Sequence, residues 1–327
     1  MNASVPRVAV IGVGSFGARH LQGLARIDRP LHVDVVDPSE ASRKRAAALL
    51  AEVGGLRGGT CAMHGDLSML SEAPDLAIVA TAARERPQAV RDVVSLGTRR
   101  MILEKVLFTR LADYDEVAGL FERRRLQVWV NCARRAYPRA AALKQLVAGR
   151  PIRYTVTGAG WGLASNVIHH LDEFSMLCGH VDIEVSAEGL SSRLTEAKRP
   201  GYVEFFGSLQ SRAPDGSRFI AVCTEGTESV PGDREITIET DDVRIVLRQS
   251  RDTLSVVRNG QAHSEPYPAP LQSELTAPVV TSILDGTPPA LPDYKTAAAI
   301  HRVLIGALLE HMRRCTGNPD INECPIT

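Results

Sequence analysis

The chain has 327 residues, of which 44% are hydrophobic and 23% charged, a composition typical of a globular protein large enough for two domains. Its 38 basic and 38 acidic residues cancel, so net charge gives no reason to expect nucleic acid or an anionic membrane as a partner. The six cysteines lack zinc-site spacing, no apolar run is long enough to span a membrane, and the first apolar strand starts too early for a signal peptide. These features predict a cytoplasmic protein without a metal site.

A glycine-rich motif follows the first apolar strand. Gly12, Gly14 and Gly17 form G-x-G-x-x-G at the start of a predicted helix. The first glycine permits a tight turn, the second lets the backbone approach a pyrophosphate, and the third lets helix and strand pack closely. The next strand ends at Asp37, where a carboxylate binds the ribose hydroxyls of NAD and repels the 2′-phosphate of NADP. This order of elements predicts a dinucleotide site; the alternative is a turn that merely connects strand to helix.

Apolar strands and amphipathic helices alternate up to residue 132, which predicts a parallel sheet with right-handed crossovers, a doubly wound Rossmann domain. We expect strands over 8–11, 31–36, 75–81, 100–105 and 126–131, and helices over 15–27, 41–53, 86–96 and 114–125. Ligands bind beyond the carboxyl ends of such strands. The predicted cofactor-binding residues are therefore Gly12, Gly14, Ser15, Phe16, Gly17, Asp37, Thr81, Ala82, Glu104 and Lys105.

The pattern changes beyond residue 132. We expect helices over 140–148, 164–178, 272–285 and 294–314, and strands over 152–157, 203–209, 218–224, 235–239, 243–248 and 254–258. Turn signals separate these strands, which predicts a mostly antiparallel sheet. The fold class is thus α/β, with a Rossmann domain over 1–132 and an α+β domain with a large open sheet over 133–327.

Lys105 ends a strand at the mouth of the predicted crevice. A lysine beside a nicotinamide can protonate or deprotonate a substrate hydroxyl, because burial and nearby positive charge lower its pKa toward neutrality. The alternative is a lysine that pairs with Glu104 or lies on the surface.

The predicted helix 164–178 has an apolar stripe and a polar face. Ser165, His169 and Asp172 share the polar face, at steps of four and three residues. His169 can orient a substrate hydroxyl, and Asp172 can fix the tautomer of that histidine. His170 projects nearer the apolar stripe, so we expect it to be packed. The alternative for the polar face is simple solvation.

The whole chain resembles the Gfo/Idh/MocA oxidoreductase family, named for glucose-fructose oxidoreductase and inositol dehydrogenase. The resemblance rests on VAVIGVGSFGARH near the start and on residues 74–81, 104–105, 134–138 and 169–172. Family members bind NAD or NADP in the first domain and oxidise a sugar or cyclitol hydroxyl, or reduce the ketone. Their second-domain sheet often packs in a dimer or tetramer. The resemblance implies that Lys105 is the catalytic lysine of the Glu-Lys-Pro motif and His169 the histidine of an Asp-x-x-x-His-x-x-Asp helix.

Two positions depart from the family pattern. Ser165, followed by Asn166, stands where the family has an aspartate, and Val106 replaces the proline after the lysine. A serine or amide can still hydrogen-bond a substrate, which would leave Lys105 and His169 to move the proton. The catalytic residues expected from the resemblance are Lys105, His169, Ser165 and Asn166, with Arg135, Trp161, Asn166 and Asp172 as substrate contacts.

The sequence therefore predicts an NAD-dependent dehydrogenase or ketoreductase for a sugar-like small molecule, working as a homodimer or homotetramer. The stretch 161–169 also resembles members that act in surface-sugar assembly, which favours an amino or acidic sugar. NADP stays open as cofactor, since Arg43 and Lys44 follow Asp37 closely and can accept a phosphate. Two rival functions are an NAD-using glycosidase on the same fold and a catalytically inactive, cofactor-bound sensor or scaffold.

Overall fold

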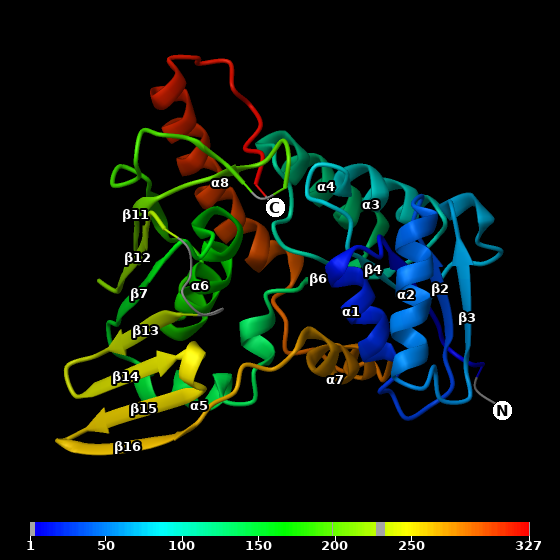
Figure 1. The fold of residues 1–327 in the computed structure, drawn as a ribbon, viewed down its shortest axis with the longest axis horizontal. Helices are drawn as coiled ribbons and strands as arrows, with labels where there is room; N and C mark the ends of the chain where they lie inside the picture. The colour runs from blue at the N-terminus through cyan, green and yellow to red at the C-terminus, as the bar shows by residue number, and fades with distance from the viewer. Residues whose placement is uncertain (1–3, 198, 227–232, 327) are drawn as a thin grey trace. The chain divides into compact units, whose positions relative to one another are not determined.

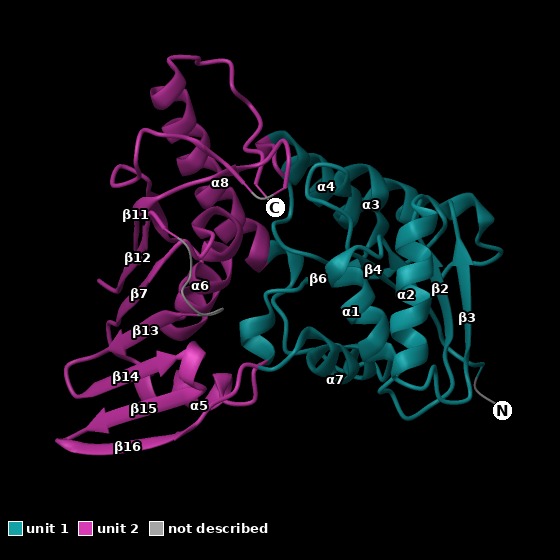
Figure 2. Ribbon diagram, in the orientation of Figure 1, with its two compact units in different colours: residues 1–108, 112–136, 270–295 teal, residues 109–111, 137–269, 296–327 magenta. Residues whose placement is uncertain are grey.

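The computed structural model describes residues 4–197, 199–226 and 233–326. The chain forms two compact units, drawn in different colours in Figure 2. Unit 1 comprises residues 1–108, 112–136 and 270–295, and unit 2 comprises residues 109–111, 137–269 and 296–327.

Unit 1 is built on a six-stranded parallel sheet with strand order β3-β2-β1-β4-β5-β6. Its strands are β1 (Arg7–Ile11), β2 (His32–Val36), β3 (Thr60–His64), β4 (Leu76–Val79), β5 (Arg100–Leu103) and β6 (Gln127–Val130). The central strands β1 and β4 consist almost entirely of buried apolar residues, because helices cover parallel sheets of this type on both faces. Strand β3 was not predicted. It lies at the edge of the sheet and is partly exposed, so its sequence lacks the apolar run of a central strand.

The helices of unit 1 include one from far along the chain. They are α1 (Ser15–Leu24), α2 (Glu40–Glu52), α3 (Arg86–Ser95), α4 (Leu111–Arg124), α7 (Gln272–Leu284) and the short 3₁₀ turns η1 (Leu67–Met69) and η2 (Ala133–Ala136). Helix α7 packs on α1, as Figure 1 shows. The contact is close because Gly23 has no side chain: a Cβ there would lie 2.5 Å from the Cβ of Thr276. The segment 270–295 thus belongs to unit 1, whereas the predicted boundary at residue 132 assigned it to the second domain.

Unit 2 contains an eight-stranded sheet with the order β16-β15-β14-β13-β7-β12-β11-β8. Its strands are β7 (Arg153–Ala159), β8 (Glu184–Ser186), β11 (Gly207–Arg212), β12 (Arg218–Thr224), β13 (Arg234–Glu239), β14 (Val243–Arg248), β15 (Thr253–Arg258) and β16 (Gln261–Pro266). Neighbouring strands are antiparallel except for β7 and β12, which are parallel. A separate pair joins β9 (Thr195–Glu196) to β10 (Val203–Glu204). The helices are α5 (Ala140–Val147), α6 (Leu163–Cys178) and α8 (Tyr294–Thr316), with the 3₁₀ turn η3 (Gln249–Arg251).

One face of this sheet is buried and the other is open. Tyr154 and Phe219 are fully buried on the first face, on which α6 packs. Their neighbours Thr155 and Ile220, which pair across the ladder, are only half-buried. This alternation is the period of two expected of a sheet covered on one side. The architecture confirms the predicted fold class, although β8 and β16 were missed and the predicted strand 203–209 is split between β10 and β11.

Candidate functional site

The glycine motif forms an open cradle at the start of α1. Gly12 has a φ of +84°, and a Cβ there would lie 2.9 Å from the backbone nitrogen of Thr81. A Cβ on Gly17 would lie 1.9 Å from the carbonyl oxygen of Gly12. No atom lies within 4 Å of the place a Cβ on Gly14 would take, and Gly14 is the exposed N-cap of α1. The first and third glycines therefore allow close backbone contacts that a side chain would block. The second leaves room for a ligand at the N-terminus of α1, the positive end of the helix dipole.

Asp37 lies directly beside this cradle. Its Oδ2 accepts a hydrogen bond from the Val13 N–H (2.8 Å) and its Oδ1 accepts one from the Ser39 N–H (2.8 Å). These bonds hold the carboxylate at the carboxyl end of β2, where the ribose of a dinucleotide binds in this fold. The Arg43 guanidinium donates to the carbonyl oxygen of Asp37, while Lys44 pairs with Glu40 at 2.7 Å. Arg43 is therefore the better placed of the two cations to meet a 2′-phosphate.

Lys105 follows β5 and is buried. Its peptide bond to Val106 is cis. Its Nζ lies 5.6 Å from the ring centroid of the exposed Phe16, on the first turn of α1. Burial lowers the pKa of Lys105, the positive charge of Arg86 lowers it further, and the negative charge of Glu104 opposes both. A lowered pKa makes this lysine release its proton more readily, which suits proton exchange with a hydroxyl.

Glu104 is held in a buried network inside unit 1. His20 Nε2 lies 2.8 Å from Glu104 Oε1, and the amide of Asn131 donates to the same oxygen at 2.5 Å. The other ring nitrogen of His20 lies 2.9 Å from the hydroxyl of Thr276 on α7. Burial alone would raise the pKa of Glu104, but the hydrogen bonds and charges of His20, Lys105 and Asn131 lower it. The carboxylate predicted to bind cofactor is thus bonded to protein donors, and it fixes the end of β5 just before Lys105.

Arg86, at the start of α3, is a residue that the sequence reasoning missed. Its guanidinium is buried and donates to the carbonyl oxygens of Val106, Leu107 (2.9 Å) and Thr81. One side chain therefore joins the carboxyl ends of β4 and β5. In the sequence it is an ordinary arginine near a helix start, and only its partners in the fold reveal this role.

We expect Arg86→Met to lower the free energy of unfolding by about 2–3 kcal/mol, because buried carbonyl groups lose a charged donor. The pKa of Lys105 should rise at the same time, since one cause of its depression is removed. Chemical denaturation and NMR titration of labelled lysine measure the two effects. The matched control is Arg91→Met on the same helix, where the arginine makes only surface bonds, to Glu116 and Gln88, and little change is expected. Equal behaviour of the two variants would contradict this role.

The other predicted cofactor residues line the same cradle. Ser15 and Phe16 are exposed on the first turn of α1, and Thr81 and Ala82 follow β4 and are half-buried. The hydroxyl oxygen of Thr81 is buried and has no hydrogen-bond partner among the described residues. The uncovered N-terminus of α1, the hydrogen-bonded carboxylate of Asp37 and the hydroxyl of Thr81 together fit the phosphates and ribose of a dinucleotide. Arg135 lies in η2, half-buried, in the same unit.

In unit 2 the predicted site residues gather where β7 leads into α6. The connecting loop contains Gly160 and Gly162, both with positive φ (+58° and +70°). Between them Trp161 is buried, and its indole N–H donates to the carbonyl oxygen of Val222 at 2.9 Å. The predicted substrate contact Trp161 therefore has its polar atom engaged inside the fold.

Ser165 and Asn166 bind the loop that precedes them. The Ser165 hydroxyl donates to the Gly162 carbonyl oxygen at 3.3 Å, and the Asn166 amide donates to the carbonyl oxygens of Trp161 (2.9 Å) and Gly162 (3.0 Å). Both side chains are half-buried, as is His169 one turn further along α6. Asp172 is buried, so simple solvation does not explain the whole polar face.

His170 is packed, as predicted. It is buried, and its Nδ1 lies 2.9 Å from the hydroxyl of Tyr154. That hydroxyl donates to Glu173 Oε2 at 2.6 Å. His170 therefore holds α6 on the sheet.

Glu204, on β10, was not predicted from the sequence. Its Oε1 accepts hydrogen bonds from the Ala164 N–H (2.5 Å) at the start of α6 and from the Phe205 N–H (3.0 Å). Burial raises the pKa of Glu204, and the two N–H groups oppose the rise. It lies 40 positions beyond the helix residue it contacts, so no sequence spacing pointed to it.

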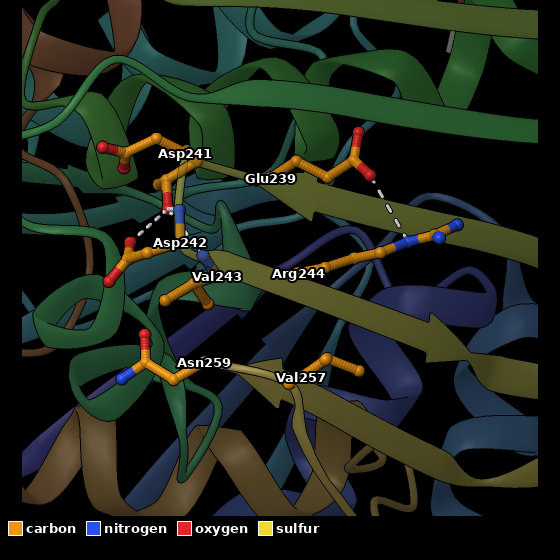
Figure 3. Close-up of a pocket in the computed structure, with 9 residues that line it drawn as sticks. Glu239, Asp241, Asp242, Val243, Arg244, Val257 and Asn259 are labelled. Atoms are coloured by element: carbon orange, nitrogen blue, oxygen red, sulfur yellow. Dashed lines mark hydrogen bonds and ion pairs between the residues drawn. The ribbon is translucent and has the colours of Figure 1, made fainter.

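A hollow at the other end of the sheet is a separate feature (Figure 3). Its walls are Glu239, Thr240, Asp241, Asp242, Val243, Arg244, Val257, Asn259 and Gly260. Glu239 pairs in register with Arg153 at the start of β7, whereas Gly158 at its end pairs with Arg234. The hollow is thus about 17 Å along the strand from the loop that leads to α6. Arg244 Nε lies 3.3 Å from Glu239 Oε1, so these two side chains of the lining form an ion pair with each other.

Comparison with known proteins gives a family match for the N-terminal part of the chain. Residues 6–132 match the GFO_IDH_MocA family model, described as an oxidoreductase family with an NAD-binding Rossmann fold. Over these residues the chain is similar to the NAD-binding domain of that oxidoreductase family. The match and the neighbours solved with NAD+ or NADP indicate NAD or NADP as the cofactor. None of the curated proteins matches the sequence.

Solved structures show that the similarity of fold extends to both units. A UDP-N-acetylglucosamine 3-dehydrogenase from Acidithiobacillus ferrooxidans superposes with a TM-score of 0.70 at 19% identity, covering 92% of this chain and 95% of the other. An Agrobacterium radiobacter oxidoreductase, solved with NAD+, L-tartaric acid and magnesium, gives 0.70 at 16% identity over 94% and 96%. A 3-ketoreductase from Actinomadura kijaniata, solved with NADP, gives 0.69 at 15% identity over 93% and 96%.

No helix in the described part of the chain is both long and apolar enough to cross a membrane. Within the same residues, no group of three or more His, Cys, Asp or Glu side chains could hold a metal ion.

Proposed function

We propose that the protein is an NAD(P)-dependent dehydrogenase or ketoreductase that acts on a hydroxyl or keto carbon of a sugar or cyclitol. The observation that supports this most is the buried lysine with a lowered pKa, Lys105, placed beside a dinucleotide cradle. Dehydrogenation of an alcohol requires a group that takes the hydroxyl proton, and an uncharged lysine amine can do so. The names of the structural relatives, a sugar-nucleotide dehydrogenase and a ketoreductase, favour a sugar substrate.

In this proposal the chain's own residues bind the substrate and move its proton. When bound, a nicotinamide cofactor would supply the hydride acceptor for oxidation and the hydride donor for reduction. Lys105 takes the proton of the hydroxyl during oxidation and returns it to the oxygen during reduction of the ketone. His169 orients that oxygen, and Ser165 and Arg135 offer hydrogen bonds to the remaining hydroxyls. Asn166, Trp161 and Asp172 act mainly by shaping α6 and its loop, given the bonds or burial described above.

A panel experiment tests the proposal. Purified protein is mixed with NAD or NADP and with free sugars, cyclitols, sugar acids and nucleotide-linked amino sugars, and reduced nicotinamide is followed by absorbance. We expect net cofactor turnover with at least one compound. Release of free sugar from a glycoside without net cofactor turnover would favour the glycosidase instead. Cofactor binding without any reaction would favour a sensor or scaffold.

Asp37 should set the choice between the two cofactors. We expect Asp37→Ser to weaken NAD binding by about tenfold, and to strengthen NADP binding, because the carboxylate that meets the ribose hydroxyls is lost while Arg43 remains. Fluorescence titration with NADH and NADPH measures both affinities. A variant that keeps the wild-type ratio of affinities would show that Asp37 does not select the cofactor.

We further propose that the open face of the unit 2 sheet packs against a second copy, giving a dimer or tetramer. Half-buried Thr155, Ile220 and Thr237 on that face support this, since small and β-branched side chains pack well between sheets. A reducing cytoplasm as location is supported by the six cysteines, all of which are free thiols.

A further inference from the structure

Helix α6 carries the predicted substrate-binding residues of unit 2 but offers no acidic side chain of its own in its first two turns, Leu163 to His169. We propose that Glu204, from the neighbouring strand β10, supplies the carboxyl group that faces the substrate at this helix end. The inference rests on the proposed function and assigns a substrate-contacting residue to it.

The two oxygens of Glu204 have different environments. Oε1 accepts both backbone hydrogen bonds, from the Ala164 N–H and the Phe205 N–H. For Oε2 there is no hydrogen-bond partner among the described residues. One oxygen therefore anchors the side chain to the helix, and the other stays available to a ligand. A carboxylate used only as a helix cap needs just the first of these oxygens.

Three polar atoms, two from α6 and one from β10, surround one point at this helix end. A Cβ on Gly162 would lie 3.1 Å from Ser165 Oγ, 3.1 Å from Asn166 Nδ2 and 3.3 Å from Glu204 Oε2. Gly162 has the positive φ that favours glycine, so the backbone there leaves these atoms uncovered by a side chain. His169 lies four residues after Ser165, on the same face of α6. Oε2 of Glu204 thus belongs to the same polar group as the two residues predicted to meet substrate.

The electrostatic surroundings suit a carboxyl group that exchanges protons. Burial raises the pKa of Glu204. The nearby thiol of Cys223 on β12 has a raised pKa as well, from burial, and the charge of Glu204 contributes. His169 on α6 is the other titratable group of this cluster. A glutamate in this setting can accept a hydrogen bond from a substrate hydroxyl when ionised and donate one when protonated.

The deciding variant is Glu204→Gln. Its amide oxygen can still accept both backbone hydrogen bonds, so the midpoint of thermal unfolding should stay near that of wild type. We expect kcat for the best substrate of the panel to fall about 10²- to 10⁴-fold. Adding Ser165→Asp to Glu204→Gln should restore at least about tenfold of this loss, since it places a carboxylate in the same polar group. The matched control is Glu274→Gln, another glutamate that accepts a backbone N–H at a helix start, in unit 1, where kcat should not change.

A second measurement needs no turnover. The carboxyl group of Glu204 is titrated by NMR in ¹³C-glutamate-labelled protein, with Glu204→Gln for assignment. We expect a pKa above that of an ordinary glutamate, and a further rise of about one unit or more in Ser165→Asp, because two carboxylates that share a space disfavour each other's ionisation.

The outcomes separate the two proposals. Wild-type protein that turns over no compound overturns the proposed function, whatever the titration shows. Turnover by wild type and equally by Glu204→Gln, or a Glu204 titration that Ser165→Asp leaves unmoved, overturns the assignment of Glu204 and leaves the proposed function standing.

Discussion

Replacing Lys105 with alanine should lower kcat by about 10²- to 10⁴-fold while NAD binds almost as well as in wild type. In the proposed reaction the side-chain amino group of Lys105 exchanges the proton with the substrate. The phosphates and ribose of the cofactor are bound instead by the N-terminus of α1 and by Asp37. Loss of the contact with the Phe16 ring should affect binding only slightly. Steady-state kinetics measure kcat, and fluorescence titration with NADH measures binding.

The matched variant is Lys105→Arg, which keeps the positive charge but cannot release its proton near neutral pH. It should be as inactive as the alanine variant. In wild type, oxidation needs the uncharged amine, so kcat should rise with pH through the lowered pKa of Lys105. Substantial activity of Lys105→Arg, or an unchanged pH profile, would remove the lysine from proton transfer.

A pair of glycine variants should separate cofactor binding from folding. Gly14→Ala adds a methyl group where no protein atom lies within 4 Å, so the free energy of unfolding should change by less than about 1 kcal/mol. NAD affinity should nevertheless fall by about tenfold or more, because this glycine lets the pyrophosphate approach the backbone. Denaturant titration and NADH fluorescence measure the two quantities.

Gly17→Ala should show the opposite pattern. Its Cβ would lie 1.9 Å from the carbonyl oxygen of Gly12, so helix and strand have to move apart. We expect a loss of about 3 kcal/mol of stability, the size of a severe overpacking. Normal NAD affinity in Gly14→Ala would mean that the cofactor phosphates do not approach this turn.

Much of unit 1 could be predicted because its central strands are buried on both faces. Strands β1 and β4 are almost uninterrupted apolar runs, and a glycine motif and Asp37 follow the first two strands in order. Strands that are only partly buried could not be predicted from the sequence. The edge strand β3 is only partly buried and β16 is exposed and mostly polar, so both lack the pattern that predicts a strand.

Candidate site residues could be named from the sequence where they follow a recognisable element, and were missed where a partner comes from elsewhere in the chain. Lys105 and His169 could be singled out because each has a fixed place on a strand end or a helix face. Arg86 and Glu204 have no such place in the sequence pattern, because each acts through hydrogen bonds to backbone groups 20 and 40 positions away, a carbonyl oxygen and an N–H respectively. The bonds that occupy Asn166 and Trp161 were likewise invisible, because helical spacing says nothing about loop carbonyls.

The close packing of α7 on Gly23 matters for anyone who wishes to recombine this protein with its relatives. A chimera joined once near residue 132 would take a new α7 from the donor, with a foreign surface against α1 and no assured hydroxyl for His20. Exchanging unit 2 cleanly therefore calls for a second junction near residue 270 and a third near residue 295, so that residues 270–295 stay with unit 1.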